Sequence, residues 1–462
     1  MQPTYLLFFL LFLSSIGYIL GKRKAFAVAG SSANIKNLHS RPVYYGAITA
    51  LWAGIPALIL FGVWVFFEDT IITGIIVAQL PESFQSLPAA RLGLVMNDIK
   101  NIVEGSTLMG EVDPALERAA ARYEQLLFTS HMALTILTAS ISIIITLVIR
   151  QKMTSQTRAR NHVETVVKFI LIACSTIAIF TTIGIVLSVL YESIRFFRII
   201  PLTDFIFGLE WSPQMAMRED QVGSSGQFGA IPVFAGTLLI SAIAMSVAVP
   251  IGLLSAIYLS EYAARKVRAT VKPIMEVLAG IPTVVYGFFA ALTVAPFFRN
   301  LGASIGMDIS SESALAAGLV MGIMIIPFVS SISDDVINAV PQDLRDGAYG
   351  LGATKSETIK QVVIPAALPG IVGGILLAIS RAIGETMIVV MAAGLAANMT
   401  GNPFKAVTTV TVQIVTLLIG DQEFDSPKTL AAFALGLILF LITLVLNVVA
   451  LVVVRKYREQ YE

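Results

Sequence analysis

Two charged residues interrupt a long apolar run near the C-terminal end of the chain. Arg381 and Glu385 lie in the string Ser380-Arg381-Ala382-Ile383-Gly384-Glu385-Thr386. If the run 367–396 is one helix, their four-residue spacing places both side chains on one face. A charge in a bilayer costs roughly 2.5–3.5 kcal/mol even on lenient scales, so such residues usually pair or face a polar interior.

Two interpretations of this pair remain open. It is either an ion pair within one helix that only fixes packing, or part of a translocation path for an anion. In the second case Arg381 lines the path, Glu385 holds its side chain in place, and Thr386 belongs to the same stretch. Arginine suits oxyanions because its planar guanidinium group can donate two hydrogen bonds at once.

A candidate gate lies in the apolar run 273–298. Pro282 removes a backbone hydrogen bond and is predicted to bend this helix. Tyr286 and Glu276 complete the candidate gate. A harmless kink packed against neighbouring helices explains Pro282 equally well, and Glu276 is close enough to the helix start to reach the membrane interface instead.

The segment 336–366 is a charged interruption of about thirty residues between two apolar runs. Pro341 can open a short helix, and Gly350 and Gly352 interrupt it. Thr354-Lys355-Ser356-Glu357 has the form of a capping box and can start a second helix. Prolines at 365 and 369 are predicted to break the chain before the next span. We therefore expect a charged helix-turn-helix.

No residue set predicts a cofactor, a metal or catalysis. The stretch 350–356 approaches a phosphate-binding loop, but that pattern needs Gly before the Lys, and Thr354 stands there. The three histidines, His39, His131 and His162, have no metal-ligand spacing. A single cysteine, Cys174, cannot form an internal disulfide.

The composition places these residues in a membrane. The 462 residues are 56% hydrophobic and 13% charged, with a mean hydropathy of +0.82, whereas soluble domains carry about 25% charged residues. The net charge of +1 gives no reason to expect a nucleic-acid partner. We predict an all-α polytopic fold with nine spans, at roughly 3–20, 43–67, 127–149, 165–191, 231–259, 273–298, 313–333, 367–396 and 429–454.

The charge bias of the loops predicts the orientation. Lys and Arg dominate the loops 22–42, 150–164 and 260–272 and the C-terminal tail, whereas the segment 68–126 holds nine acids and four bases. The positive-inside rule then places the N-terminus outside and the C-terminus and segment 336–366 in the cytoplasm. No positive charge precedes the first apolar run, so we expect an uncleaved span rather than a signal peptide.

The chain is predicted to divide near residue 160. Residues 1–160 hold three spans and the acidic outer segment 68–126, and residues 161–462 hold six spans and the motifs. The acidic segment would repel free anions, which favours a contact or assembly role. A second outer segment, 192–230, contains a Gly/Ser-rich stretch at 223–226 that is expected to be a loop.

The segment 336–366 resembles the cytoplasmic loop of ABC importer permeases, whose form is E-A-A-x3-G-x9-I-x-L-P. Asp346, Gly347 and Ala348 precede Gly352 at the family spacing, and Val362, Ile364 and Pro365 follow it. The departures are Asp for Glu, Gly for the first Ala, Val for Ile and Ile for Leu. The resemblance implies that the loop docks on an ATPase subunit, so that ATP is hydrolysed by a separate chain.

Residues 165–462 also resemble the phosphate-importer permeases of the PstC type, through this loop, the string 280–289 and the string 381–387. Residues 1–160 are similar to the extension of a longer variety. The resemblance implies a type I, MetI-like six-helix core in the bacterial inner membrane that imports inorganic phosphate by alternating access. The implied partners are a PstA-type permease, two PstB-type ATPase subunits, a periplasmic PstS-type phosphate-binding protein, and a phosphate-sensing kinase with its regulator.

Two alternatives stay open beside this interpretation. The chain is a permease for another oxyanion, such as phosphonate, phosphite or molybdate, or it is a membrane sensor or scaffold that transports nothing. An independent enzyme is not expected, because no nucleophile–base pair and no metal set is present.

Overall fold

The computed structural model describes residues 3–30, 38–85, 87–103, 113–213, 226–419 and 426–458. Nine helices within these ranges are long and apolar enough to cross a membrane, which confirms the predicted all-α polytopic class. The spans are Thr4–Ala29, Pro42–Gln79, Pro114–Lys152, Ala159–Ile199, Ile231–Tyr262, Thr283–Ser304, Ala314–Ala339, Lys355–Ile383 and Pro427–Lys456.

The chain forms two compact units, Met1–Phe180 and Thr181–Glu462, and the boundary lies inside helix α6. In the first unit, three long helices pack on one another. Glycines allow the close approach: a Cβ at Gly21 would lie 2.6 Å from the carbonyl oxygen of Tyr45. The helices of this unit are α1 (Pro3–Ala29), α2 (Pro42–Gln79), α3 (Glu82–Gln85), α4 (Ala89–Val103), α5 (Pro114–Lys152) and the first part of α6 (Ala159–Ile199).

The second unit is built around α12 (Ala314–Ala339), the span with the largest buried share. It packs closely on α8 (Ile231–Ile257), because small residues face each other: a Cβ at Gly322 would lie 2.9 Å from the carbonyl oxygen of Ala244. The remaining helices of this unit are α7 (Leu202–Phe207), α9 (Arg265–Ala279), α10 (Thr283–Phe289), α11 (Ala295–Ser304), α13 (Gln342–Gly350), α14 (Lys355–Thr358), α15 (Ile364–Ile383), α16 (Met387–Ala392), α17 (Val410–Leu418) and α18 (Pro427–Arg458).

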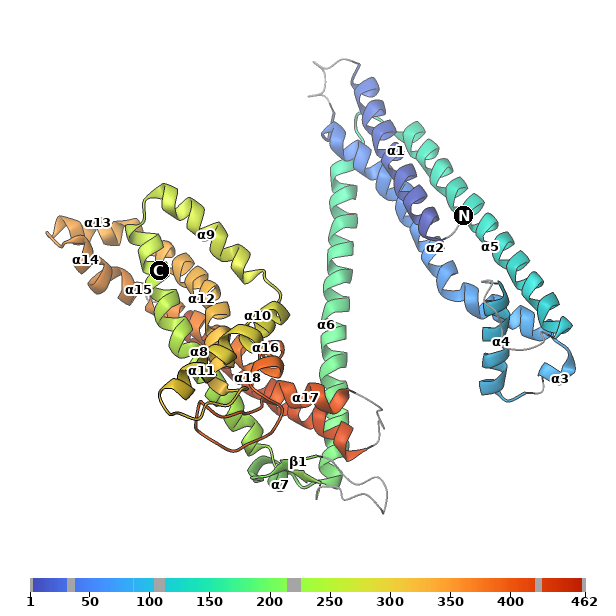
Figure 1. Ribbon diagram of the computed structural model, residues 1–462. Helices are drawn as coiled ribbons and strands as arrows, with labels where there is room; N and C mark the ends of the chain where they lie inside the picture. Colours follow the sequence, from blue (N-terminus) through green and yellow to red (C-terminus); the bar gives the residue numbers. More distant parts are fainter. Residues whose placement is uncertain are drawn as a thin grey trace. The chain divides into compact units, whose positions relative to one another are not determined.

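Figure 1 shows the short helices α13 and α14 at one end of the second unit and α7 with strand β1 at the other. The strands β1 (Trp211–Ser212) and β2 (Gln227–Phe228) pair antiparallel. Aromatic side chains from α6, α7 and both strands meet edge to face around Phe205, which is fully buried. Of the loop expected at 223–226, residues 223–225 lie outside the described residues.

Two sequence predictions about helix continuity are wrong. The run 273–298 is not one bent helix: α9 ends at Ala279, and Pro282 precedes the first residue of α10. Prolines 365 and 369 do not break the chain, because a π-helical turn, Ile359–Val363, joins α14 to α15. Pro365 cannot donate a backbone hydrogen bond, and the wider π-helical turn tolerates this missing bond, so the helix continues.

Candidate functional site

The polar segment 336–366 folds into the predicted helix-turn-helix, here called the α13–α14 hairpin. Gly352 has a φ of +88°, a left-handed conformation that favours glycine, and it turns the chain between the two helices. The capping box is present: the Thr354 amide donates to Glu357 Oε2 at 2.8 Å, and the Glu357 amide donates to Thr354 Oγ1 at 3.4 Å.

The other residues that match the ABC permease loop pattern lie on α13 and where the hairpin continues into α15. Asp346 is exposed on α13 and accepts a hydrogen bond from Gln342, Gly347 has open space around it, and Ala348 is buried. Val362 is half-buried in the π-helical turn. Ile364 and Pro365 form the start of α15.

The hairpin is held to the end of α8, which continues as a π-helical turn, Tyr258–Tyr262. Arg345 Nη2 lies 3.0 Å from Glu261 Oε1, and the same guanidinium donates to the carbonyl oxygens of Ile337 and Val340. The Lys355 ammonium lies 5.0 Å from the centre of the Tyr262 ring. The hairpin is therefore tied to α8 by side-chain contacts and to α12 and α15 by the chain itself.

The tip of the hairpin presents an apolar side chain. Leu351, between the two helices, is 92% exposed, and Leu344 and Tyr349 on α13 are also exposed. Large apolar side chains on an otherwise charged surface are typical of protein contacts.

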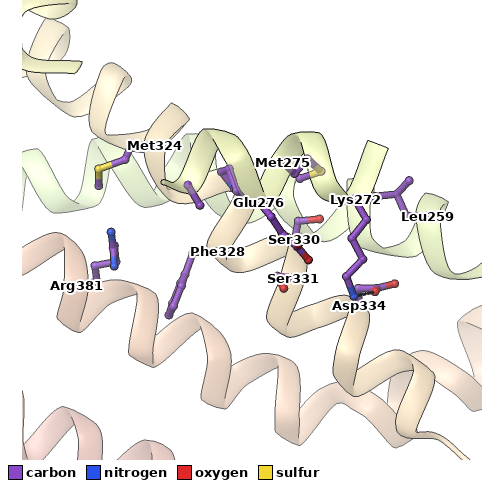
Figure 2. A pocket seen from close by; sticks show the side chains of 12 residues that line it. Leu259, Lys272, Met275, Glu276, Met324, Phe328, Ser330, Ser331, Asp334 and Arg381 are labelled. Carbon is purple, nitrogen blue, oxygen red and sulfur yellow. Dashed lines mark hydrogen bonds and ion pairs between the residues drawn. The ribbon is translucent and has the colours of Figure 1, made fainter. Parts of the chain in front are cut away.

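A pocket of about 250 Å³ lies between α9, α12 and α15 (Figure 2). Charged and hydroxyl groups gather in it with apolar walls, which is the composition of a selective binding site. Lining residues are Leu259, Lys272, Met275, Glu276, Ala279, Met324, Pro327, Phe328, Ser330, Ser331, Asp334 and Arg381.

One end of the pocket holds a charge cluster around Asp334. Its carboxylate is buried and accepts from Lys272 at 2.9 Å and from Arg268 at 3.0 Å, which ties α9 to α12. The hydrogen bond that Lys272 donates to Asp334 raises the pKa of Lys272, so this ammonium is charged at neutral pH. The charged groups of this cluster pair with one another, so they mainly hold α9 and α12 together.

Arg381, at the end of α15, lines the pocket as well. Its guanidinium lies over the ring of Phe328 at 5.7 Å from the ring centre. Figure 2 shows it across the pocket from the Lys272–Asp334 pair. In the isolated chain, the Arg381 side chain is exposed.

The prediction that Arg381 and Glu385 share one face of a continuous helix is wrong. Helix α15 ends at Ile383, and Gly384 separates it from α16. The Glu385 carboxylate instead accepts from the amides of Met387 and Ile388, at 3.1 and 3.5 Å, and so caps α16. Thr386, the residue before α16, donates to the carbonyl oxygen of Gly384. Of these three residues only Arg381 lines the pocket.

The candidate gate residues are also separated. Glu276 lines the pocket, whereas Pro282 and Tyr286 do not. Tyr286 donates from its hydroxyl to the carbonyl oxygen of Leu278 at 3.0 Å, so it braces the junction between α9 and α10. The turn around Pro282 sets the direction of α10 relative to α9.

Sequence reasoning missed the residues that assemble the site. Glu261 and Arg345 are 84 positions apart, and Arg268 and Asp334 are 66 apart, so no local pattern joins them. The available signal was the pair Asp334-Asp335 at the end of an apolar run, opposite the bases of 260–272. In the part of the chain that the structure describes, no group of three or more His, Cys, Asp or Glu side chains could hold a metal ion.

Comparisons with known proteins match both halves of the chain. A family model described as "Binding-protein-dependent transport system inner membrane component" matches residues 248–459, and one described as "Phosphate ATP-binding cassette transporter" matches residues 7–181. The phosphate transport system permease protein PstC of Mesorhizobium japonicum is 38% identical over 242 residues, which cover 48% of this chain and 72% of that protein. The chain belongs to the PstC family of permeases.

A second PstC-family comparison agrees with the first. The PstC protein of Haemophilus influenzae is 32% identical over 251 residues, which cover 50% of this chain and 78% of that protein. A crystal structure of an amino acid ABC transporter is similar with 21% identity and a TM-score of 0.35, covering 49% of this chain and 92% of that chain. The family model over 248–459 and the PstC relatives identify this PstC-family chain as a multi-pass permease subunit of a binding-protein-dependent transport system. The match to 248–459 includes every helix of the pocket and the hairpin.

Proposed function

We propose that this chain is the permease subunit of an ATP-driven importer of inorganic phosphate. The observation that carries the proposal is the pocket between α9, α12 and α15, in which Arg381 is the one guanidinium among the lining residues. A guanidinium matches the oxygen geometry of phosphate. The family's relatives named as phosphate transport system permeases support the choice of anion.

The α13–α14 hairpin is the proposed docking site for an ATPase subunit on the cytoplasmic side. Leu351 and its exposed neighbours supply an apolar contact, and the resemblance residues Asp346, Gly347, Ala348, Gly352, Val362, Ile364 and Pro365 form the hairpin and its continuation into α15. Closure of the ATPases would move the hairpin. The Arg345–Glu261 contact would then carry that movement to α8.

Alternating access is the proposed mechanism. The hairpin joins α12 and α15, two of the three helices around the pocket, so a shift of the hairpin would change the pocket. The breaks at Pro282 and Gly384 divide the membrane helices near the pocket into shorter pieces. Short pieces can rotate about such breaks, which suits a gate formed by Pro282, Tyr286 and Glu276.

The complete transporter would hold a second permease of related fold, two ATPase subunits and an external phosphate-binding protein. The N-terminus lies outside and the C-terminus in the cytoplasm in this proposal, because the basic loops then share the cytoplasmic side. Residues 1–160 form an added three-span extension, and 161–462 form the six-span core. The proposed contact with a phosphate-sensing kinase rests only on the resemblance to the family.

Uptake of labelled anions tests the function. Vesicles that hold the full complex and its binding protein are supplied with labelled phosphate, with and without ATP, and with phosphonate, phosphite or molybdate as competitors. We expect ATP-dependent phosphate uptake that none of the competitors displaces at equal concentration. If one competitor lowers the uptake more strongly than unlabelled phosphate does, that anion is assigned as the substrate instead. If no anion is taken up, the result favours a membrane sensor or scaffold.

A further inference from the structure

Glu276 lies in the same pocket as Arg381, although a carboxylate is unfavourable in a path for anions. It is on α9, one helical turn after Lys272. Lys272 does not neutralise it, because that ammonium is held by Asp334 at 2.9 Å and Asp335 at 3.2 Å. In the described residues the Glu276 carboxylate has no hydrogen-bond or ion-pair partner within the chain.

The charge balance of the pocket makes this carboxylate informative. Lys272 and Asp334 offset each other, which leaves the Arg381 guanidinium and the Glu276 carboxylate as the two charges available to a bound anion. Arg381 attracts every oxyanion, but Glu276 repels one that carries only acceptor oxygens. An anion that keeps a proton reverses this effect, because its O–H group can donate to the carboxylate.

We propose that Glu276 is a specificity-determining residue that selects oxyanions retaining a proton. Hydrogen phosphate and hydrogen arsenate are such anions at neutral pH, whereas sulfate and molybdate are not protonated there. Arg381 binds two oxygens of the anion, Glu276 accepts its O–H group, and the hydroxyl groups of Ser330 and Ser331 serve as neutral partners that can donate or accept. A site built to pair with a substrate O–H group rejects the analogue that lacks it more strongly than shape alone allows. This inference rests on the proposed phosphate path.

Hydrogen phosphate and sulfate are the matched pair for a test, because at slightly alkaline pH both are mainly tetrahedral dianions and differ by one proton. Labelled phosphate is bound to the purified complex of permeases and ATPases without its binding protein, whose own selectivity would otherwise decide the result. Unlabelled arsenate, sulfate and molybdate then compete. The wild-type complex, Glu276→Gln and Asp335→Asn are compared. Asp335→Asn removes the same charge close to the pocket at a residue that does not line it.

The wild-type complex and Asp335→Asn should favour arsenate over sulfate by about tenfold or more, the size of one charge-assisted hydrogen bond. In Glu276→Gln the amide can donate to sulfate, so the preference should fall to within about threefold while phosphate still binds. A preference that is unchanged in Glu276→Gln, or absent in the wild-type complex, overturns the role of Glu276 alone. Failure of the wild-type complex to bind phosphate, together with failure of phosphate uptake, overturns the proposed function as well.

Discussion

The guanidinium of Arg345, on α13, lies 3.0 Å from the carboxylate of Glu261 at the end of α8. Both side chains are nearly buried, at 12% and 10% exposure, and Arg345 also donates to the carbonyl oxygens of Ile337 and Val340. This ion pair links the hairpin directly to α8, a helix that the hairpin does not adjoin in sequence.

Breaking this link should destabilise the folded complex. Glu261→Gln and Arg345→Gln each leave one nearly buried charge without its partner, so each should lower the free energy of unfolding by about 2 kcal/mol. The double variant should lose less than the sum of the two. Chemical unfolding of the purified complex measures the unfolding free energy of the wild type, the two single variants and the double variant. Additive losses of unfolding free energy would show that the two side chains act independently.

The turn at Gly352 should be sensitive to any side chain. Its φ of +88° disfavours other residues, and open space surrounds it, so Gly352→Ala should cost about 1 kcal/mol from backbone strain alone. Gly347→Ala is the matched control, because Gly347 is helical and equally uncrowded, and it should be neutral or slightly stabilising.

ATPase binding gives the second measurement at these two positions. Gly352→Arg should weaken the copurification of the ATPase subunit at least tenfold, because a bulky charge at the turn lies beside the apolar tip at Leu351. Gly347→Ala should leave it unchanged. Equal ATPase recovery with Gly352→Arg would remove the hairpin from the docking surface.

Glu385 should behave as a helix cap rather than as the partner of Arg381. Glu385→Ala removes the acceptor for two amides at the start of α16 and should destabilise the complex by about 1 kcal/mol. Glu385→Gln keeps an acceptor oxygen and should transport phosphate at more than half the wild-type rate. Loss of transport in Glu385→Gln as complete as in an Arg381 variant would restore the direct pairing that sequence spacing predicted.

The Lys272–Asp334 contact should be insensitive to pH over the physiological range. The hydrogen bond that Lys272 donates to Asp334 raises the folded-state pKa of Lys272. The contribution of this contact to stability is therefore fully present below the unfolded pKa, about 10.4, and is lost as pH rises through the folded pKa. The difference in unfolding free energy between wild type and Lys272→Met, about 1 kcal/mol, should stay constant from about pH 6 to 9.

Arginine at position 268 provides the control for that pH dependence, because a guanidinium stays protonated in proteins. The effect of Arg268→Met should therefore persist above about pH 10.5, where the effect of Lys272→Met declines. A Lys272→Met effect that changes between pH 6 and 9 would show that another group governs the contact.

The sequence predicted the parts of this fold that depend on local pattern. Nine apolar runs were predicted, and the described residues contain nine candidate spans. The capping box of Thr354 and Glu357 formed as its spacing requires. The hairpin turn at Gly352 also follows from residue type, because glycine adopts positive φ without strain.

The rest depends on contacts that local pattern does not contain. Gly384 alone does not predict the end of α15, because the apolar residues on both sides of this glycine favour a helix. Pro365 suggested a break, but the π-helical turn before it tolerates the backbone hydrogen bond that proline cannot donate. The pocket joins residues from position 259 to position 381, so Glu276 could be placed beside Arg381 only by the fold.

The central claim is that one chain passes phosphate along Arg381 and is driven through a separate hairpin. Phosphate uptake and ATP hydrolysis measured together in vesicles that hold the full complex test it most directly, with Arg381→Gln beside the wild type. We expect Arg381→Gln to retain its ATPase subunits and to hydrolyse ATP, but to take up phosphate at least 100-fold more slowly, which corresponds to an activation free energy higher by about 2.7 kcal/mol. Phosphate uptake at the wild-type rate in Arg381→Gln would contradict the account.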